Sequence, residues 1–169
     1  MLRLLPALLL ICTTLAWAED VRELTWSEMI PADAPSQDMQ AAPIHDLSKL
    51  ADTLSAEMAP AAVQQSPNAP VVPALNGQAV KLPGYIVPLD VTDDGKVTEF
   101  LLVPYFGACI HVPPPPSNQI VLVKYAKGVQ MDALYQPFWI RGPLKVESSS
   151  SELAEAGYQM SADDVYPYE

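Results

Sequence analysis

The chain has 169 residues, 50% of them hydrophobic, and a formal net charge of −11 at pH 7. This length suits one domain with a real hydrophobic core and is short for two. Nucleic acid and anionic lipid both repel a protein this acidic, so we exclude them as partners.

The first eighteen residues have the pattern of a secretory signal peptide. Arg3 supplies the positive start, residues 4–15 form an apolar run, and residues 16–18 (Ala-Trp-Ala) fit a cleavage site between small residues. The run is too short to cross a bilayer comfortably, and no other segment qualifies. We therefore expect a mature chain of residues 19–169, located in the periplasm and without a membrane span.

The two cysteines fall on opposite sides of the expected cleavage site. Cys12 lies within the signal peptide, so the mature chain keeps only Cys109. An internal disulfide is then impossible. A lone thiol in an oxidising compartment is buried, metal-bound, catalytic or paired with another molecule.

Residues 19–74 are expected to form an N-terminal region outside the main domain. Thr25 precedes a short helical clip, with Glu28 placed to reach back to its backbone and Pro31 ending the turn. We expect Trp26 and Met29 to dock this clip on the domain.

Three further segments complete the N-terminal region. Residues 31–43 are rich in Pro, Ala and Gln and predict an exposed linker. Apolar residues recur at helical spacing over residues 44–58, which predicts a helix ended by Pro60. Residues 60–74 are punctuated by prolines and predict an extended connector.

From about residue 75 the pattern changes to short strands. We expect strands over residues 79–89, 97–105, 119–125, 138–146 and 157–160, turns at 93–96 and 126–128, a bend at 142–143, and a short helix from Glu152. Pro83 and Pro88 favour an edge strand or bulges in the first strand.

The predicted fold class is mainly β (α+β). Strands of this length and spacing favour a small, strongly bent β-barrel over residues 75–169, preceded by the N-terminal helical segment. On strand count, an oligonucleotide/oligosaccharide-binding (OB)-like barrel is the first choice.

The segment Phe100–Val123 combines features that an ordinary strand does not need. It has no Asp, Glu, Lys or Arg, yet it contains Cys109, His111 and four consecutive prolines at 113–116. The segment therefore predicts both burial and a functional site.

Cys109 and His111 form a candidate metal site. On a strand, side chains two residues apart point to the same face, so both would reach one ion. A thiolate and an imidazole suit zinc or copper. A structural zinc site has four ligands, and the others would come from His45, an acidic side chain or a partner protein.

Two other interpretations of Cys109 and His111 stay open. In a catalytic pair, the histidine would lower the thiol pKa, with Asn118 as an orienting group and the backbone N–H groups of residues 107–108 as an oxyanion site. Nothing in the sequence fixes that geometry. In a structural interpretation, Cys109 is a small buried hydrophobe and His111 bonds a backbone carbonyl.

The four prolines also have two interpretations. A polyproline II segment can be a docking ridge for an aromatic-lined groove on another protein. It can equally be an internal brace, packed against Trp139, Tyr105 or Phe106. The amides of Asn118 and Gln119 would then satisfy backbone groups near the turn.

Three stretches carry a family resemblance: residues 82–89 (LPGYIVPL), 100–119 (FLLVPYFGACIHVPPPPSNQ) and 138–142 (FWIRG). With them the chain resembles a family of exported bacterial proteins, domain-of-unknown-function family 3299. The resemblance covers roughly residues 75–160. It implies a metal-linked accessory role beside ABC-type transport systems, with Cys109 and His111 as signature positions.

These observations favour a non-enzymatic periplasmic binding or accessory protein. Cys109 and His111 are the expected metal ligands, zinc is the expected ion, and components of an ABC-type transporter are the expected partners. The alternatives are a thiol-dependent enzyme using Cys109 and His111, and an interaction module using the four prolines.

Overall fold

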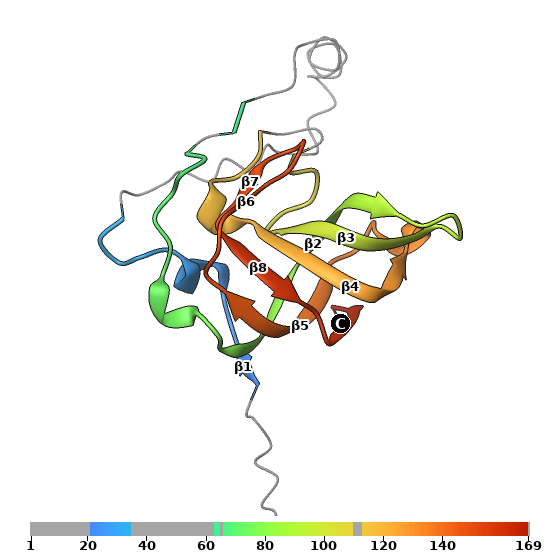
Figure 1. The fold of residues 1–169 in the computed structure, drawn as a ribbon, viewed down its shortest axis with the longest axis horizontal. Coiled ribbons are helices and arrows are strands. Elements are labelled where there is room, and N and C mark those ends of the chain that lie inside the picture. Colours follow the sequence, from blue (N-terminus) through green and yellow to red (C-terminus); the bar gives the residue numbers. More distant parts are fainter. Residues whose placement is uncertain (1–20, 35–62, 65, 110–112, 169) are drawn as a thin grey trace, which may run out of the picture.

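A computed structural model describes residues 21–34, 63–64, 66–109 and 113–168 (Figure 1). The predicted signal peptide and the helix predicted over residues 44–58 lie outside these ranges. In the part of the chain that is described, no helix has the length and apolarity needed to cross a membrane.

The described chain is mainly β. Its strands are β1 (Arg22–Glu23), β2 (Ala79–Val91), β3 (Lys96–Val103), β4 (Val121–Gln130), β5 (Phe138–Lys145), β6 (Ser149–Ser150), β7 (Glu155–Ala156), β8 (Tyr158–Ser161) and β9 (Asp164–Pro167). Its helices are single 3₁₀ turns: η1 (Trp26–Met29), η3 (Pro73–Leu75), η4 (Ser117–Gln119) and η5 (Met131–Ala133).

Seven strands form one sheet in the order β1-β2-β3-β4-β8-β5-β9, and β6 and β7 form a separate pair. β2 also pairs with β5, through residues 79–84, while its residues 85–91 pair with β3. Gly84 lies where β2 changes partner, and a Cβ there would lie 2.7 Å from the Val103 carbonyl oxygen. Only glycine allows this close approach of the two strands.

The expected strands are found, with differences in detail. The proline-rich first strand is continuous, and its register shifts directly after Pro88, as the bulge prediction required. The turn predicted at residues 126–128 is wrong: β4 continues through it, and a register shift against β3 absorbs the extra residues. The helix predicted from Glu152 is also wrong, because residues 152–153 form a bend before β7.

β3 is buried on both faces. Phe100 and Leu102 belong to the main core between the strands, whereas Leu101 and Val103 belong to a second core on the opposite face. The second core is closed by the β3–β4 connection and by β7, through Ala108, Ile120, Ala154 and Ala156. Two-sided burial explains the absence of charge from residues 100–103.

The N-terminal clip is part of the main core. Leu24 and Met29 are completely buried, and the Trp26 indole N–H donates to the Pro83 carbonyl over 2.7 Å. The predicted docking of Trp26 and Met29 is therefore confirmed. This docking brings β1 beside β2 as a parallel neighbour.

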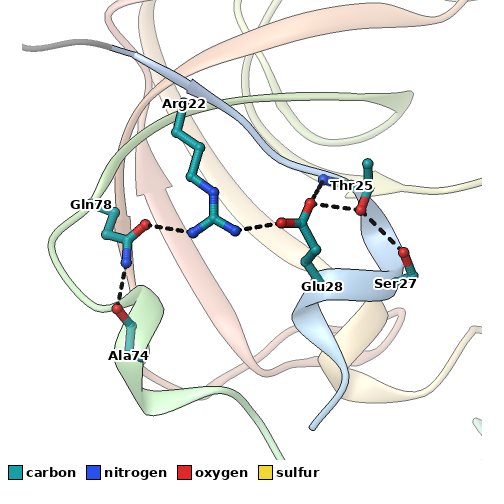
Figure 2. A network of polar contacts seen from close by, with 6 residues as sticks. All are labelled: Arg22, Thr25, Ser27, Glu28, Ala74 and Gln78. Carbon is teal, nitrogen blue, oxygen red and sulfur yellow. Dashed lines mark hydrogen bonds and ion pairs between the residues drawn. The ribbon is translucent and has the colours of Figure 1, made fainter. Parts of the chain in front are cut away.

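Polar contacts hold the clip in register (Figure 2). The Glu28 carboxylate accepts the Thr25 backbone N–H at 2.8 Å and the Thr25 hydroxyl at 2.7 Å, and it pairs with the Arg22 guanidinium. Arg22 also donates to the Gln78 side chain at the start of β2. The hydrogen bonds from Thr25, followed by Arg22, lower the pKa of Glu28 to about 2.

The connector before η3 is packed against the domain. The Gln64 side chain donates to the Pro115 and Glu155 carbonyls, and the Asn118 side chain donates to the Pro70 carbonyl. Val71 and Val72 pack against the main core. These contacts tie Gln64 and Pro70 to the β3–β4 connection, and Gln64 also to β7.

The first prediction concerns the second core. Leu101→Ala is expected to lower the free energy of unfolding by about 3 kcal/mol, as much as Leu102→Ala, because both side chains are completely buried. Leu153→Ala, at a leucine that is 38% exposed, is the control and should cost under about 1 kcal/mol. Urea unfolding measures all three. A cost for Leu101→Ala close to that of the control would contradict two-sided burial of β3.

The second prediction concerns the clip. Because the folded-state pKa of Glu28 is depressed from 4.5 to about 2, its carboxylate stabilises the fold above pH 4.5, and this contribution is lost as pH falls toward 2. The difference in free energy of unfolding between wild type and Glu28→Gln, measured by denaturant unfolding, should therefore become smaller as the pH falls from 4.5 toward 2. Glu152→Gln, at an exposed carboxylate away from the clip, reports the general effect of acid. A difference that does not change with pH would contradict the role given to Glu28.

Candidate functional site

Cys109 lies in a turn of the β3–β4 connection and not on a strand. β3 ends at Val103, and Cys109 has φ = +67°, in the left-handed region that non-glycine residues seldom occupy. We expected Cys109 and His111 to share one face of a strand. This expectation is wrong for Cys109, because Cys109 is not on a strand. His111 and His45 lie outside the described residues.

Cys109 is the one predicted metal ligand that the structure describes. Among the described residues, no three His, Cys, Asp or Glu side chains come together in a group that could hold a metal ion. A structural zinc site needs four ligands. The described part of the chain does not supply that set by itself.

The environment of Cys109 is apolar. The half-buried side chain packs against the second core, as do those of Leu89 and Tyr105. Burial raises the pKa of the Cys109 thiol to about 11 and also raises the pKa of Tyr105, where the nearby thiolate adds a smaller effect. The thiol is therefore protonated at neutral pH, whereas a nucleophilic cysteine needs a lowered pKa.

A partly exposed apolar surface lies against the second core, where the Cys109 side chain also packs. We call it the Cys109 surface and define it as Tyr85, Leu89, Tyr105, Phe106 and Cys109. The Phe106 side chain is 47% exposed, and its ring meets Tyr85 edge-on with centroids 5.7 Å apart. The other members are half-buried, so the second core reaches solvent here.

The four prolines form an internal brace. Pro114, Pro115 and Pro116 are buried and Pro113 is half-buried. The Pro115 carbonyl accepts the Gln64 side-chain N–H at 2.9 Å, and the Pro116 carbonyl accepts the Gln119 backbone N–H at 2.8 Å. Of the two interpretations, burial favours the brace, because a docking ridge would expose its rings.

The amides of Asn118 and Gln119 donate to backbone carbonyls as predicted, but the Pro70 and Trp26 carbonyls are not near the turn in sequence. Asn118 and Gln119 are both completely buried. Asn118 donates to the Pro70 carbonyl at 2.8 Å, and Gln119 donates to the Trp26 carbonyl at 2.9 Å. These bonds join the turn after the prolines to the connector and to the N-terminal clip.

Sequence reasoning missed the surface that these elements leave open. It named Tyr105 and Phe106 only as packing partners for the prolines. The available signal was an aromatic pair, Tyr105 and Phe106, within a charge-free run and directly before a glycine.

The fold and the Cys109 surface define a mainly β domain with a fixed N-terminal clip and a partly exposed apolar face. The chain belongs to the family described as "Protein of unknown function (DUF3299)", whose model matches residues 26–167. The family resemblance is thereby confirmed. No curated protein matches the chain.

A solved structure supports the same assignment. The chain is similar to a DUF3299 family protein from Pseudomonas aeruginosa PAO1, known from a crystal structure, with 67% identity and a TM-score of 0.74. The match covers 89% of this chain and 97% of the other. The two proteins therefore share a fold over nearly their whole length.

The third prediction concerns the thiol. Alkylation of Cys109 by iodoacetamide should be slow at pH 8 and should rise with a midpoint near the thiol pKa of about 11. The urea-unfolded protein gives the reference rate, and Cys109→Ser should remain unlabelled. A midpoint at or below about 8.5, the value of a free cysteine, would contradict the buried thiol.

Proposed function

We propose that the chain is a non-enzymatic binding or accessory protein of the periplasm, which contacts a protein partner through the Cys109 surface. The observation that carries this proposal is the exposed Phe106 ring beside half-buried Tyr85, Leu89 and Tyr105. Exposed aromatic side chains on a rigid apolar base are typical of interface centres. The signal-like residues 1–18 support export.

A component of an ABC-type transport system is the partner class that we propose. The support is the role implied by the family resemblance, together with the acidic charge of the chain, which disfavours nucleic acid and anionic lipid. A protein face with an apolar centre and few negative charges would complement the Cys109 surface.

We also infer that the domain is an OB-like barrel. The support is the set of strand pairings: β2 pairs with β3, β3 with β4, β4 with β8, β8 with β5, and β5 again with β2. The parallel pair in this ring is β4–β8, and the other pairs are antiparallel. In a ring of this kind the central strands have no free edge.

Zinc would be bound by Cys109 and His111, with the remaining ligands supplied by the partner or by the rest of the chain. The support is the ligand chemistry of a thiolate and an imidazole, which suits zinc. A half-buried Cys109 at the rim of an interface is accessible to an ion that the partner also holds. Zinc would then connect the two proteins and not only stabilise this one.

The two alternatives have less support. A thiol-dependent enzyme needs an activated thiolate, and the apolar packing of Cys109 gives the opposite environment. An interaction module built on the prolines needs exposed rings, and Pro114–Pro116 are buried.

Site-specific photo-crosslinking tests the proposed interface. A benzophenone side chain in place of Phe106 should crosslink to a transport component in cells, whereas the same group in place of Tyr135 should not. Tyr135 is a matched control because it is an aromatic residue that is 73% exposed and outside the Cys109 surface. Equal crosslinking at both positions, or no crosslink at Phe106, would contradict the proposal.

The fourth prediction concerns the metal. Wild type together with its partner should bind zinc with a higher stoichiometry than the Cys109→Ser, His111→Ala double variant in an equilibrium titration. Unchanged urea unfolding of the variant would show that its fold is intact. Equal zinc stoichiometry for wild type and the double variant would contradict the assignment of Cys109 and His111 as zinc ligands.

A further inference from the structure

A small open cavity lies away from the Cys109 surface. Its volume is about 300 Å³, and it lies between the connector, the turn η4, the chain after β5 and the start of β8. The lining residues are Pro67, Asn68, Ala69, Val71, Ser117, Val146, Glu147, Ser148 and Gly157. This volume is at the lower end of the range for small-molecule sites.

The cavity has an apolar wall and a negative rim. Pro67, Ala69, Val71 and Val146 supply aliphatic surface. Among the residues that the structure describes, Glu147 is the one charged residue in the lining, and no Lys, Arg or His contributes to it. The cavity therefore favours a ligand with an aliphatic part and a positive end.

Ser117 supplies a polar group at the base. The residue is 3% exposed, and its hydroxyl oxygen accepts the Ala69 backbone N–H at 2.9 Å. The hydroxyl can still accept a second hydrogen bond or donate its own. Asn68 and Ser148 also line the cavity. Their side-chain oxygens can accept hydrogen bonds from an ammonium group, in addition to the Glu147 carboxylate.

We propose that this cavity binds an alkylammonium group. The methylene chain would lie along Val71 and Val146, and the ammonium would pair with the Glu147 carboxylate. The net charge of −11 adds an attractive field for a cation. The source would be either a free amine or a lysine side chain of another protein, which present the same chemistry.

This site is independent of the proposed function. None of the residues of the Cys109 surface lines the cavity. Binding of a transport component at Phe106 and binding of an amine at Glu147 can therefore each fail without the other.

An NMR titration of the mature chain tests the proposal. Addition of n-butylammonium chloride should give saturable amide shifts centred on residues 68, 69, 71, 117 and 146–148. n-Butanol, which has the same methylene chain without the charge, should bind more weakly. The affinity for n-butylammonium should fall as salt increases, because the carboxylate is at the surface.

Glu147→Gln keeps the shape of the side chain and removes the charge. It should weaken n-butylammonium binding by about fivefold, as expected for a partly solvated ion pair. Glu152→Gln, at an exposed carboxylate outside the cavity, should leave the affinity unchanged. Absence of saturable binding, equal binding of n-butanol, or equal binding by wild type and Glu147→Gln would each overturn the proposal.

A second comparison distinguishes the two sources. An end-capped tripeptide with a central lysine and 1,5-diaminopentane are titrated separately against wild type. Tighter binding of the peptide assigns the cavity to a lysine of a partner protein, and tighter binding of the diamine assigns it to a free amine. Failure of both would overturn the proposal.

Discussion

The burial of β3 on both faces is the constraint on which the rest of the structure depends. A strand covered on one side only would alternate apolar and polar residues, but residues 100–103 are all completely buried. The chain must therefore provide a second cover on the outer face. That cover is the β3–β4 connection together with β7, and its core residues include Ala108, Ile120 and Ala156.

The same constraint explains the composition of the connection and the position of the candidate site. A buried connection must satisfy its backbone groups. Prolines remove donors, and the amides of Asn118 and Gln119 donate to carbonyls of the connector and the clip. The cover becomes incomplete at Cys109 and Phe106, where the second core meets solvent. The Cys109 surface is thus the exposed rim of a fixed second core.

Local patterns predicted local structure well. The strand over residues 79–89 and the helical clip around Trp26 follow from neighbouring residues. The failures involved distant contacts. Pairing of β2 with both β3 and β5 depends on the close approach at Gly84. β3 ends at Val103, so Cys109 does not have the strand geometry that its spacing from His111 predicted. The sequence of residues 119–128 gave no indication that β4 would continue through residues 126–128.

Native-state hydrogen exchange tests the central claim, a fixed second core, most directly. The backbone N–H groups of Ile120 and Gly157 both donate to the Ser117 carbonyl, at 3.2 and 2.7 Å, and so report on the outer cover. If the cover is part of the cooperative fold, both amides should exchange with the same opening free energy as the amides of β3. Exchange of Ile120 and Gly157 through a much smaller opening free energy, while β3 stays protected, would contradict it.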